Sequence, residues 1–243
     1  MTGAVVLETR GLVKEYRDRR VVDQVNVQVR GSSVVGLLGP NGAGKTTTFY
    51  SIVGFIRPTS GAVLLDGEDI TALPIHQRAA RGITYLSQEP SVFKKLTVEE
   101  NVRIVLEPLG LPRNEIDNRI GELMAELKLE YLAGHKGHAL SGGERRRVEI
   151  MRALATKPRF ILLDEPFAGV DPLSVADLQG IIRDLKQKGL GILISDHNVR
   201  ETLQVCDLAY IMNNGQILTS GGAEDIIQSA VARKMYLGDH FTM

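Results

Sequence analysis

A glycine-rich stretch with one lysine is the first part of this 243-residue chain whose residue types could do chemistry. Residues 39–46 read GPNGAGKT and follow the apolar run 34–38, so a strand is expected to end where the stretch begins. The stretch fits G-x-x-x-x-G-K-[ST] between a strand and a helix, which is the context of a phosphate-binding loop. Glycines let backbone N–H groups turn toward phosphate oxygens, because no Cβ blocks the path. The sequence therefore predicts a nucleoside triphosphate site.

Two side chains at the end of this stretch have chemical roles of their own. Lys45 is expected to assist catalysis by placing positive charge against the β- and γ-phosphates, and Thr46 to offer its hydroxyl to Mg²⁺. The helix that begins there directs its positive end at the same anion. The loop residues predicted to bind the nucleotide are Gly39, Asn41, Gly42, Ala43, Gly44, Lys45, Thr46 and Thr47.

Acidic and imidazole side chains follow two other apolar runs. Residues 160–165 read FILLDE, in which Asp164 can hold Mg²⁺ through water and Glu165 can polarise an attacking water. Two acids at a strand end are common on protein surfaces, but the phosphate loop upstream favours the catalytic interpretation. His197 follows the run 191–195, at the carboxyl edge where parallel sheets bind ligands. We expect His197 to sense the γ-phosphate.

Composition limits the class of protein. Hydrophobic residues make up 43% of the chain, which is enough for a sizeable core. Lys plus Arg and Asp plus Glu both number 29, so no broad positive field would attract nucleic acid. The single cysteine, Cys206, cannot form an internal disulfide and suits a reducing compartment. No window reaches the ~18 apolar residues of a membrane span, so a soluble, cytoplasmic chain is expected.

The elements that must position these residues form an α/β core. The runs 34–38, 160–163 and 191–195 are almost wholly apolar and are separated by helical stretches, as in a mostly parallel sheet buried on both faces. Residues 4–30 instead alternate β-branched and polar residues, which predicts an antiparallel β region at the N-terminus.

The organisation along the chain is predicted to be one domain, 1–243. Its catalytic core comprises 1–90 and 140–220, and residues 91–139 form an inserted helical subdomain, since strand signals disappear there. Thr97 and Glu100 fit a capping box that opens a helix. A second helix carries apolar residues at helical spacing: Ile116, Ile120, Leu123, Met124 and Leu127. The tail 221–243 is expected to hold one amphipathic helix with an apolar side made of Ile226, Ile227, Ala230, and Met235 or Leu237.

Residues 140–144, LSGGE, resemble the signature motif of the ATP-binding-cassette (ABC) ATPases. The order of this motif with Gln88, Asp164, Glu165 and His197 also matches that family, so the resemblance covers nearly the whole chain. It implies an ABC-type P-loop ATPase core that uses ATP and Mg²⁺.

The resemblance further implies a homodimer with two shared ATP sites. Ser141, Gly142 and Gly143 would present a second anion-binding helix start, which in this family contacts the nucleotide held by the phosphate loop of the other subunit. Two copies then pack head to tail around the ATP.

Other family roles are carried over by position. Tyr16 resembles the aromatic residue that stacks on adenine, with a tyrosine packed on the early sheet as the alternative. Gln88 resembles the glutamine that reaches Mg²⁺ and the attacking water while its loop contacts the membrane partner, and Asp171 belongs to the loop that senses the other subunit's site. Phe93 is expected in the docking groove, with a place in the buried core as the alternative. Residues 145–147, RRR, are interpreted as a solvated or interface face rather than a nucleic-acid patch.

A single cassette without membrane spans resembles a transporter subunit, which implies two transmembrane partner subunits docking near Gln88 and Phe93. Within transporters, the stretches 141–150, 164–172, 195–202 and 236–241 resemble the ATPases of lipopolysaccharide export. Such a subunit lies in the cytoplasm, attached to the inner membrane through its partners, without touching the transported substrate or nucleic acid. The alternative is an ATPase of branched-chain amino-acid import, and the remote alternative is a soluble ABC ATPase acting on nucleic acid.

Overall fold

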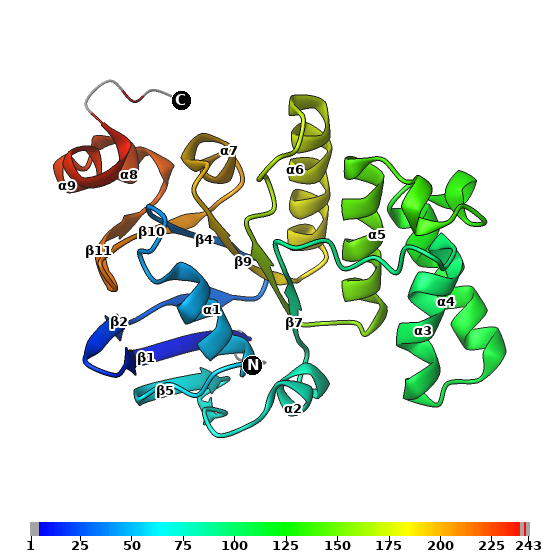
Figure 1. The fold of residues 1–243 in the computed structure, drawn as a ribbon, viewed down its shortest axis with the longest axis horizontal. Coiled ribbons are helices and arrows are strands. Elements are labelled where there is room, and N and C mark those ends of the chain that lie inside the picture. The colour runs from blue at the N-terminus through cyan, green and yellow to red at the C-terminus, as the bar shows by residue number, and fades with distance from the viewer. Residues whose placement is uncertain (1–4, 239–240, 242–243) are drawn as a thin grey trace.

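Two β-sheets organise the chain (Figure 1), whose computed structural model describes residues 5–238 and 241. The larger sheet has the strand order β11-β10-β4-β9-β8-β7, and all neighbours are parallel except the β10–β11 hairpin. The predicted α/β core with a mostly parallel sheet is confirmed. The strands are β4 (Val34–Leu38), β7 (Ile83–Leu86), β8 (Phe160–Asp164), β9 (Gly191–Asp196), β10 (Leu208–Asn213) and β11 (Gln216–Gly221).

The central strands are apolar throughout because their side chains point alternately to two covered faces of the sheet. Every residue of β4, β8 and β9 is buried. Ile161 and Leu163 of β8 face a cluster shared with helical segments on both sides of β8 in the sequence, whereas Phe160 and Leu162 face a second cluster shared with the N-terminal strands. Successive side chains in a strand point to opposite faces, so a sheet covered on both faces needs apolar residues at every position.

The N-terminal region forms the predicted antiparallel sheet. Its order is β2-β1-β5-β6, and β3 pairs with β1 on the edge opposite β5. The strand β5 comes from beyond the phosphate loop and was not anticipated by the sequence. The strands are β1 (Val6–Tyr16), β2 (Arg19–Val25), β3 (Gln28–Arg30), β5 (Ser60–Leu65) and β6 (Glu68–Asp69).

The helices α3, α4 and α5 lie together at one end of the molecule (Figure 1). The capping box of α3 is present, since the Glu100 N–H donates to Thr97 Oγ1 (3.1 Å) and the Thr97 N–H to Glu100 Oε2 (2.7 Å). Within the described ranges, no helix has both the length and the apolar character needed to cross a membrane. The helices outside the tail are α1 (Lys45–Val53), α2 (Ile75–Ala80), α3 (Val98–Leu106), α4 (Arg113–Glu126), α5 (Gly142–Ala155), α6 (Pro172–Gln187) and α7 (Val199–Leu203), with short 3₁₀ turns at Glu107–Leu109, Glu130–Leu132 and Gly137–Ala139.

The tail contains short helical segments instead of the single amphipathic helix that we predicted. They are α8 (Ala223–Gln228), α9 (Ala230–Ala232) and a π-helical turn at Arg233–Leu237. Ser229 is extended between the two helices, and its hydroxyl accepts the Ala232 N–H (3.2 Å), so a local cap competes with helix continuation. Ile226 is buried, as expected, but Ala230 and Met235 are exposed, and Leu237 takes the apolar position.

The tail also touches the carboxyl edge of the larger sheet. Tyr236 donates its hydroxyl hydrogen to the His197 carbonyl (3.0 Å), and burial raises the pKa of Tyr236 to about 12. Tyr236, Leu237 and Phe241 pack against the cluster that includes Leu38 of β4. The end of the described chain therefore lies beside one of the predicted site residues.

A buried arginine fixes the helix that begins at the phosphate loop. Arg78 of α2 is 1% exposed and donates to the carbonyls of Ser51 (2.7 Å), Ile52 (2.6 Å), Leu73 (2.9 Å) and Thr71 (2.8 Å). Two of these carbonyls lie in the last turn of α1, where carbonyls lack helical partners and a cation is favoured by the helix dipole. Burial lowers the pKa of Arg78 to about 10, so the charge persists at neutral pH.

Replacing this arginine should destabilise the fold. In Arg78→Met, four carbonyls lose a donor, two of them buried, and we expect the free energy of unfolding to fall by about 2 to 4 kcal/mol. Urea denaturation followed by circular dichroism measures the change. The matched control is Arg81→Met on the exposed end of α2, which should change stability by less than about 0.5 kcal/mol. Equal urea midpoints for Arg78→Met and the unsubstituted protein would contradict the assignment.

Candidate active site

The phosphate loop leaves β4 at its carboxyl end and leads into α1. Two of its glycines are required by space as well as by conformation. Gly39 has φ 157°, and a Cβ built there would lie 2.1 Å from the Met212 carbonyl oxygen. Gly44 has φ 108°, and its Cβ would lie 2.5 Å from the Val21 carbonyl oxygen. A side chain at either position would displace the loop, so the glycines keep its backbone close to its neighbours.

Lys45 lies inside the loop that it follows. Its Nζ donates to the carbonyl oxygens of Gly39 (2.7 Å) and Pro40 (3.1 Å), and the residue is 5% exposed. Burial lowers the pKa of Lys45, and the opposing effect of nearby carboxylates, Glu165 foremost, is smaller. The loop carbonyls thus hold the ammonium group in place near the carboxyl end of β4, where a phosphate oxygen can replace them as its partner.

Asp164 ends β8 with both carboxylate oxygens engaged. The Tyr85 hydroxyl donates to Oδ2 (3.0 Å) and the Ser195 hydroxyl donates to Oδ1. The strands β7 and β9 supply these hydroxyls because they flank β8, with Ser195 directly opposite Asp164. Burial, followed by the charge of Asp164, raises the pKa of Tyr85 well above its usual value, so the phenol stays a donor. Sequence reasoning missed both residues as site components.

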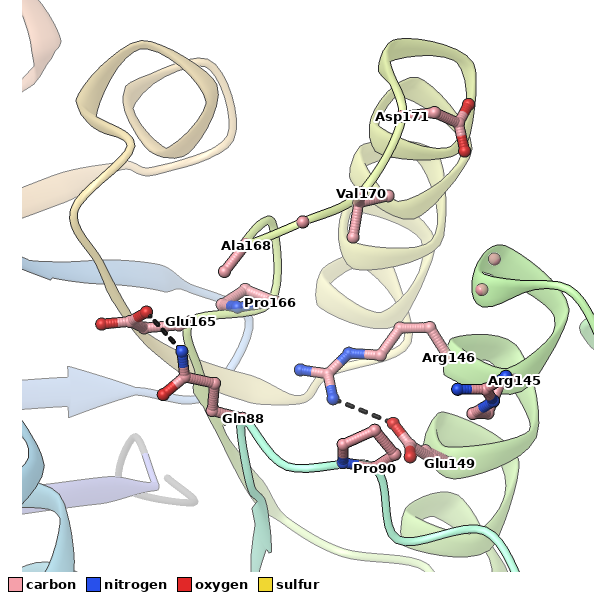
Figure 2. A pocket seen from close by; sticks show the side chains of 13 residues that line it. Gln88, Pro90, Arg145, Arg146, Glu149, Glu165, Pro166, Ala168, Val170 and Asp171 are labelled. Atoms are coloured by element: carbon pink, nitrogen blue, oxygen red, sulfur yellow. Dashed lines mark hydrogen bonds and ion pairs between the residues drawn. The ribbon is translucent and has the colours of Figure 1, made fainter. Parts of the chain in front are cut away.

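Glu165 is the point at which three predicted site residues meet. Its Oε2 accepts a hydrogen bond from Gln88 Nε2 (2.8 Å, Figure 2) and lies 3.3 Å from His197 Nδ1. Glu165 has φ 44°, a left-handed conformation that costs a non-glycine residue of order 1 kcal/mol. The Glu165 N–H is held by the Ser195 carbonyl (2.7 Å). The strained backbone aims the carboxylate at the side chains of two other loops.

Asp196 fixes the loops on either side of this point, and sequence reasoning did not single it out. Its side chain is fully buried and accepts the backbone N–H groups of Asn198 (2.8 Å) and Phe167 (3.2 Å). Burial raises the pKa of Asp196, against the opposing effect of these hydrogen bonds. One carboxylate therefore ties the segment after Glu165 to the segment after His197. The polar ending of the run 191–196 was the available signal.

The predicted metal ligands offer only oxygen atoms. Thr46 is exposed at the start of α1, Asp164 accepts hydrogen bonds through both oxygens, and Gln88 uses its amide nitrogen on Glu165, which leaves its carbonyl oxygen. Among residues 5–238 and 241, no group of three or more His, Cys, Asp and Glu could hold a metal ion by itself. Such a sparse oxygen set, with a single carboxylate, suits Mg²⁺, which binds through one or two carboxylates and completes its shell with phosphates and water.

The signature residues form an open helix start. Ser141 caps α5: its Oγ accepts the Glu144 N–H (3.3 Å) and donates to Glu144 Oε2 (2.7 Å), which lowers the pKa of Glu144. Ser141 and Gly142 are exposed, and a Cβ on Gly142 would meet nothing within 4 Å. Beside this helix start lies a cavity of about 160 Å³, bounded by α5, by residues 87–91 (the Gln88 segment) and by residues 165–171 (Figure 2).

The remaining candidates are surface residues. Tyr16 is 47% exposed at the end of β1, with Lys14 Nζ 4.9 Å from its ring centroid, and adenine stacking there stays a prediction. Phe93 is 45% exposed and lies under the Arg152 guanidinium at 4.6 Å, so its alternative assignment to the buried core is wrong. The solvated interpretation of residues 145–147 fails for Arg146, whose side chain is only 11% exposed. Asp171 caps α6 by accepting the Ser174 N–H (3.0 Å).

Known proteins resemble this chain over most of its length. A family model described as "ABC transporter" matches residues 22–168. The lipopolysaccharide export system ATP-binding protein LptB of Acidithiobacillus ferridurans is 56% identical, over 97% of this chain and 98% of that protein. LptB of Escherichia coli K12 is 51% identical, over 98% and 99%. Among solved structures, the ADP conformation of MJ1267, an ATP-binding cassette of an ABC transporter, has a TM-score of 0.87 at 31% identity, covering 97% of this chain and 99% of that one.

Removing the negative charge of Glu165 should separate binding from turnover. Glu165→Gln keeps the shape of the side chain but cannot accept a proton from water, so we expect ATP hydrolysis to fall by about a hundredfold or more. ATP binding should stay within a few-fold, because the phosphate loop is unchanged. Phosphate release and a fluorescent-nucleotide titration give the two quantities. Glu122→Gln, at an exposed carboxylate of α4, is the control. Hydrolysis at the unsubstituted rate in Glu165→Gln would remove the general-base assignment.

Proposed function

Because this chain belongs to the ATP-binding proteins of ABC transporters, we propose that it is the ATP-hydrolysing subunit of a transporter that extracts lipopolysaccharide from the inner membrane and exports it. The observation that carries the activity is the convergence of Gln88 and His197 on one oxygen of Glu165, beside the fixed carboxylate of Asp164. The transported substrate is supported by identities of 51% to 56% with LptB proteins over nearly the whole chain.

The site performs phosphoryl transfer to water by positioning and charge. Glu165 accepts a proton from the attacking water, and Gln88 and His197 orient that water and the γ-phosphate around the carboxylate. Lys45 exchanges its loop carbonyls for phosphate oxygens and offsets the negative charge that develops on them. The loop glycines turn backbone N–H groups toward the other phosphates. No side chain of the protein forms a covalent bond to phosphorus: the water oxygen bonds to the γ-phosphorus while the bond to the leaving ADP oxygen breaks.

Thr46, Gln88 and Asp164 are the residues that would hold Mg²⁺ together with the nucleotide. When bound, it neutralises charge on the β- and γ-phosphates. The hydroxyls of Tyr85 and Ser195 keep the Asp164 carboxylate in one orientation for this role.

The working form is a homodimer around two shared ATP molecules. The exposed start of α5 presents Ser141, Gly142 and Gly143 outward, and this surface takes the γ-phosphate of the ATP held by the phosphate loop of a second copy. Tyr16 of the copy that supplies the phosphate loop stacks on the adenine of this ATP. ATP closes the dimer, and hydrolysis opens it.

Closure and opening are passed to two transmembrane subunits. They dock at the surface around Gln88 and Phe93, where an exposed aromatic ring under the Arg152 guanidinium offers an anchor. The chain lies at the cytoplasmic face of the inner membrane through these partners and does not itself contact lipopolysaccharide.

The shared site predicts that a bulky cation on the signature surface blocks dimerisation but spares ATP binding. In the Glu165→Gln background, which should accumulate as a dimer with ATP, adding Ser141→Arg should leave a monomer on size-exclusion chromatography, with ATP affinity within a few-fold. The control is Asn118→Arg, the same substitution on an exposed position of α4, which should leave the dimer intact. Loss of ATP binding in Ser141→Arg would argue against a site divided between two copies.

The transported substrate is tested by the partners that co-purify. Affinity purification from native membranes in mild detergent, followed by mass spectrometry, should recover two multi-span membrane proteins linked to a periplasmic bridge. Recovery with an external amino-acid receptor would instead assign the chain to amino-acid import. Recovery with nucleic acid and no membrane protein would overturn the transporter assignment.

A further inference from the structure

The segment that carries Gln88 has little support of its own. Residues 87–91 follow β7, contain no helix or strand, and are exposed at Gln88, Glu89, Pro90 and Ser91. Such a segment is expected to vary in position unless other parts of the chain hold it. Its own internal bond joins the Ser87 hydroxyl to the Glu89 carbonyl (2.9 Å). The other bonds that hold its backbone come from the helix α5.

An ion pair of α5 holds this segment near both of its ends. Arg146 donates one Nη to the Ser87 carbonyl (3.1 Å) and to Glu149 Oε2 (3.0 Å). Glu149 Oε1 accepts the Ser91 N–H (2.7 Å), and the Ser91 carbonyl also accepts from Arg152. The Arg146 guanidinium extends from α5 toward the Gln88 segment, and its bond to Glu149 is visible beside the cavity (Figure 2). Gln88 thus lies between two residues whose backbone is tied to α5.

The burial of this pair makes a purely stabilising role unfavourable. The side chains of Arg146 and Glu149 are 11% and 4% exposed, and two buried nitrogens of Arg146, Nε and the second Nη, have no partner in the described structure. Taking two charges out of water is costly, and apolar residues of similar volume often stabilise a fold as well or better. The bonds from this pair to the Gln88 segment therefore explain its presence better than a contribution to fold stability does.

We propose that the Arg146–Glu149 pair is a positioning element that ties the Gln88 segment to the signature helix and so holds the water-orienting glutamine in its catalytic position. The inference rests on the proposed function and extends it. Ser141 begins the same helix five residues before Arg146, about 7.5 Å along its axis. A continuous series of bonded groups therefore joins Glu165, Gln88, the segment backbone, the ion pair and the start of α5.

The test replaces both charges together, so that no buried charge is left alone. In Arg146→Met/Glu149→Leu, the urea midpoint should stay at or above that of the unsubstituted protein. The exposed Ser91 N–H and the half-buried Ser87 carbonyl can then bond water. We expect kcat for ATP to fall about tenfold with KM within about twofold, because Gln88 is misplaced while the phosphate loop is intact. Arg119→Met is the matched control: this arginine of α4 is similarly buried, with an unpartnered Nε, but lies outside the pair.

A second measurement separates positioning from any other loss. In a Gln88→Ala background, the double substitution should lower kcat by less than about twofold, since it acts through a side chain that is already absent. A full tenfold loss in that background, or an unchanged kcat in the original background, would overturn the proposal. If the double variant does not fold, Glu149→Gln serves instead. It keeps the acceptor for Ser91, weakens the ion pair, and should lower kcat about threefold in the original background only.

These outcomes are distinct from failure of the proposed function. An unsubstituted chain without ATPase activity would remove the proposed function itself, before any variant is compared. An active chain whose double variant is fully active would remove only the positioning role. The measurements use the full chain at concentrations above the dissociation constant of its ATP-induced dimer.

Discussion

Parallel pairing of β4, β8 and β9 is the constraint on which the site depends. Parallel strands end at one edge, so the residues that follow them meet although they are far apart in the sequence. Lys45 follows β4 through its loop, Glu165 follows β8, and His197 follows β9. The burial of each strand on both faces fixes their order and register. Strand pairing alone therefore brings these three residues to one edge, and side-chain contacts such as that of Gln88 with Glu165 complete the site.

Rigidity at this edge comes from groups that do not touch the nucleotide. Tyr85 and Ser195 occupy both oxygens of Asp164, and Asp196 joins the two neighbouring loops. Glu165 is held in a left-handed conformation by its bond to the Ser195 carbonyl. Catalysis by preorganised charge requires that these groups not rearrange during the reaction. The free-energy cost of this conformation at Glu165 is small compared with the stabilisation from burying the apolar side chains of β8.

Sequence analysis predicted the parts of the fold that local pattern determines. The buried strands, the antiparallel N-terminal region and the capped helix at Thr97 follow from periodicity and capping residues. The supporting residues did not follow, because Tyr85 and Glu149 gain their roles from elements that pack beside them only in the folded chain. The prediction for the tail was wrong for a different reason. Apolar spacing predicted one helix, but the Ser229 hydroxyl caps the start of a second helix and so divides the segment.

The bond between the Tyr236 hydroxyl and the His197 carbonyl makes the backbone at His197 depend on the short helical segments of the tail. The segments α8 and α9 and the turn after them are short, and they rest on the core through one apolar cluster. Elements of this kind open locally at a free energy well below that of global unfolding. Amide hydrogen exchange of the tail would then report how often the backbone at His197 loses this hydrogen bond, while the sheet beneath it stays protected.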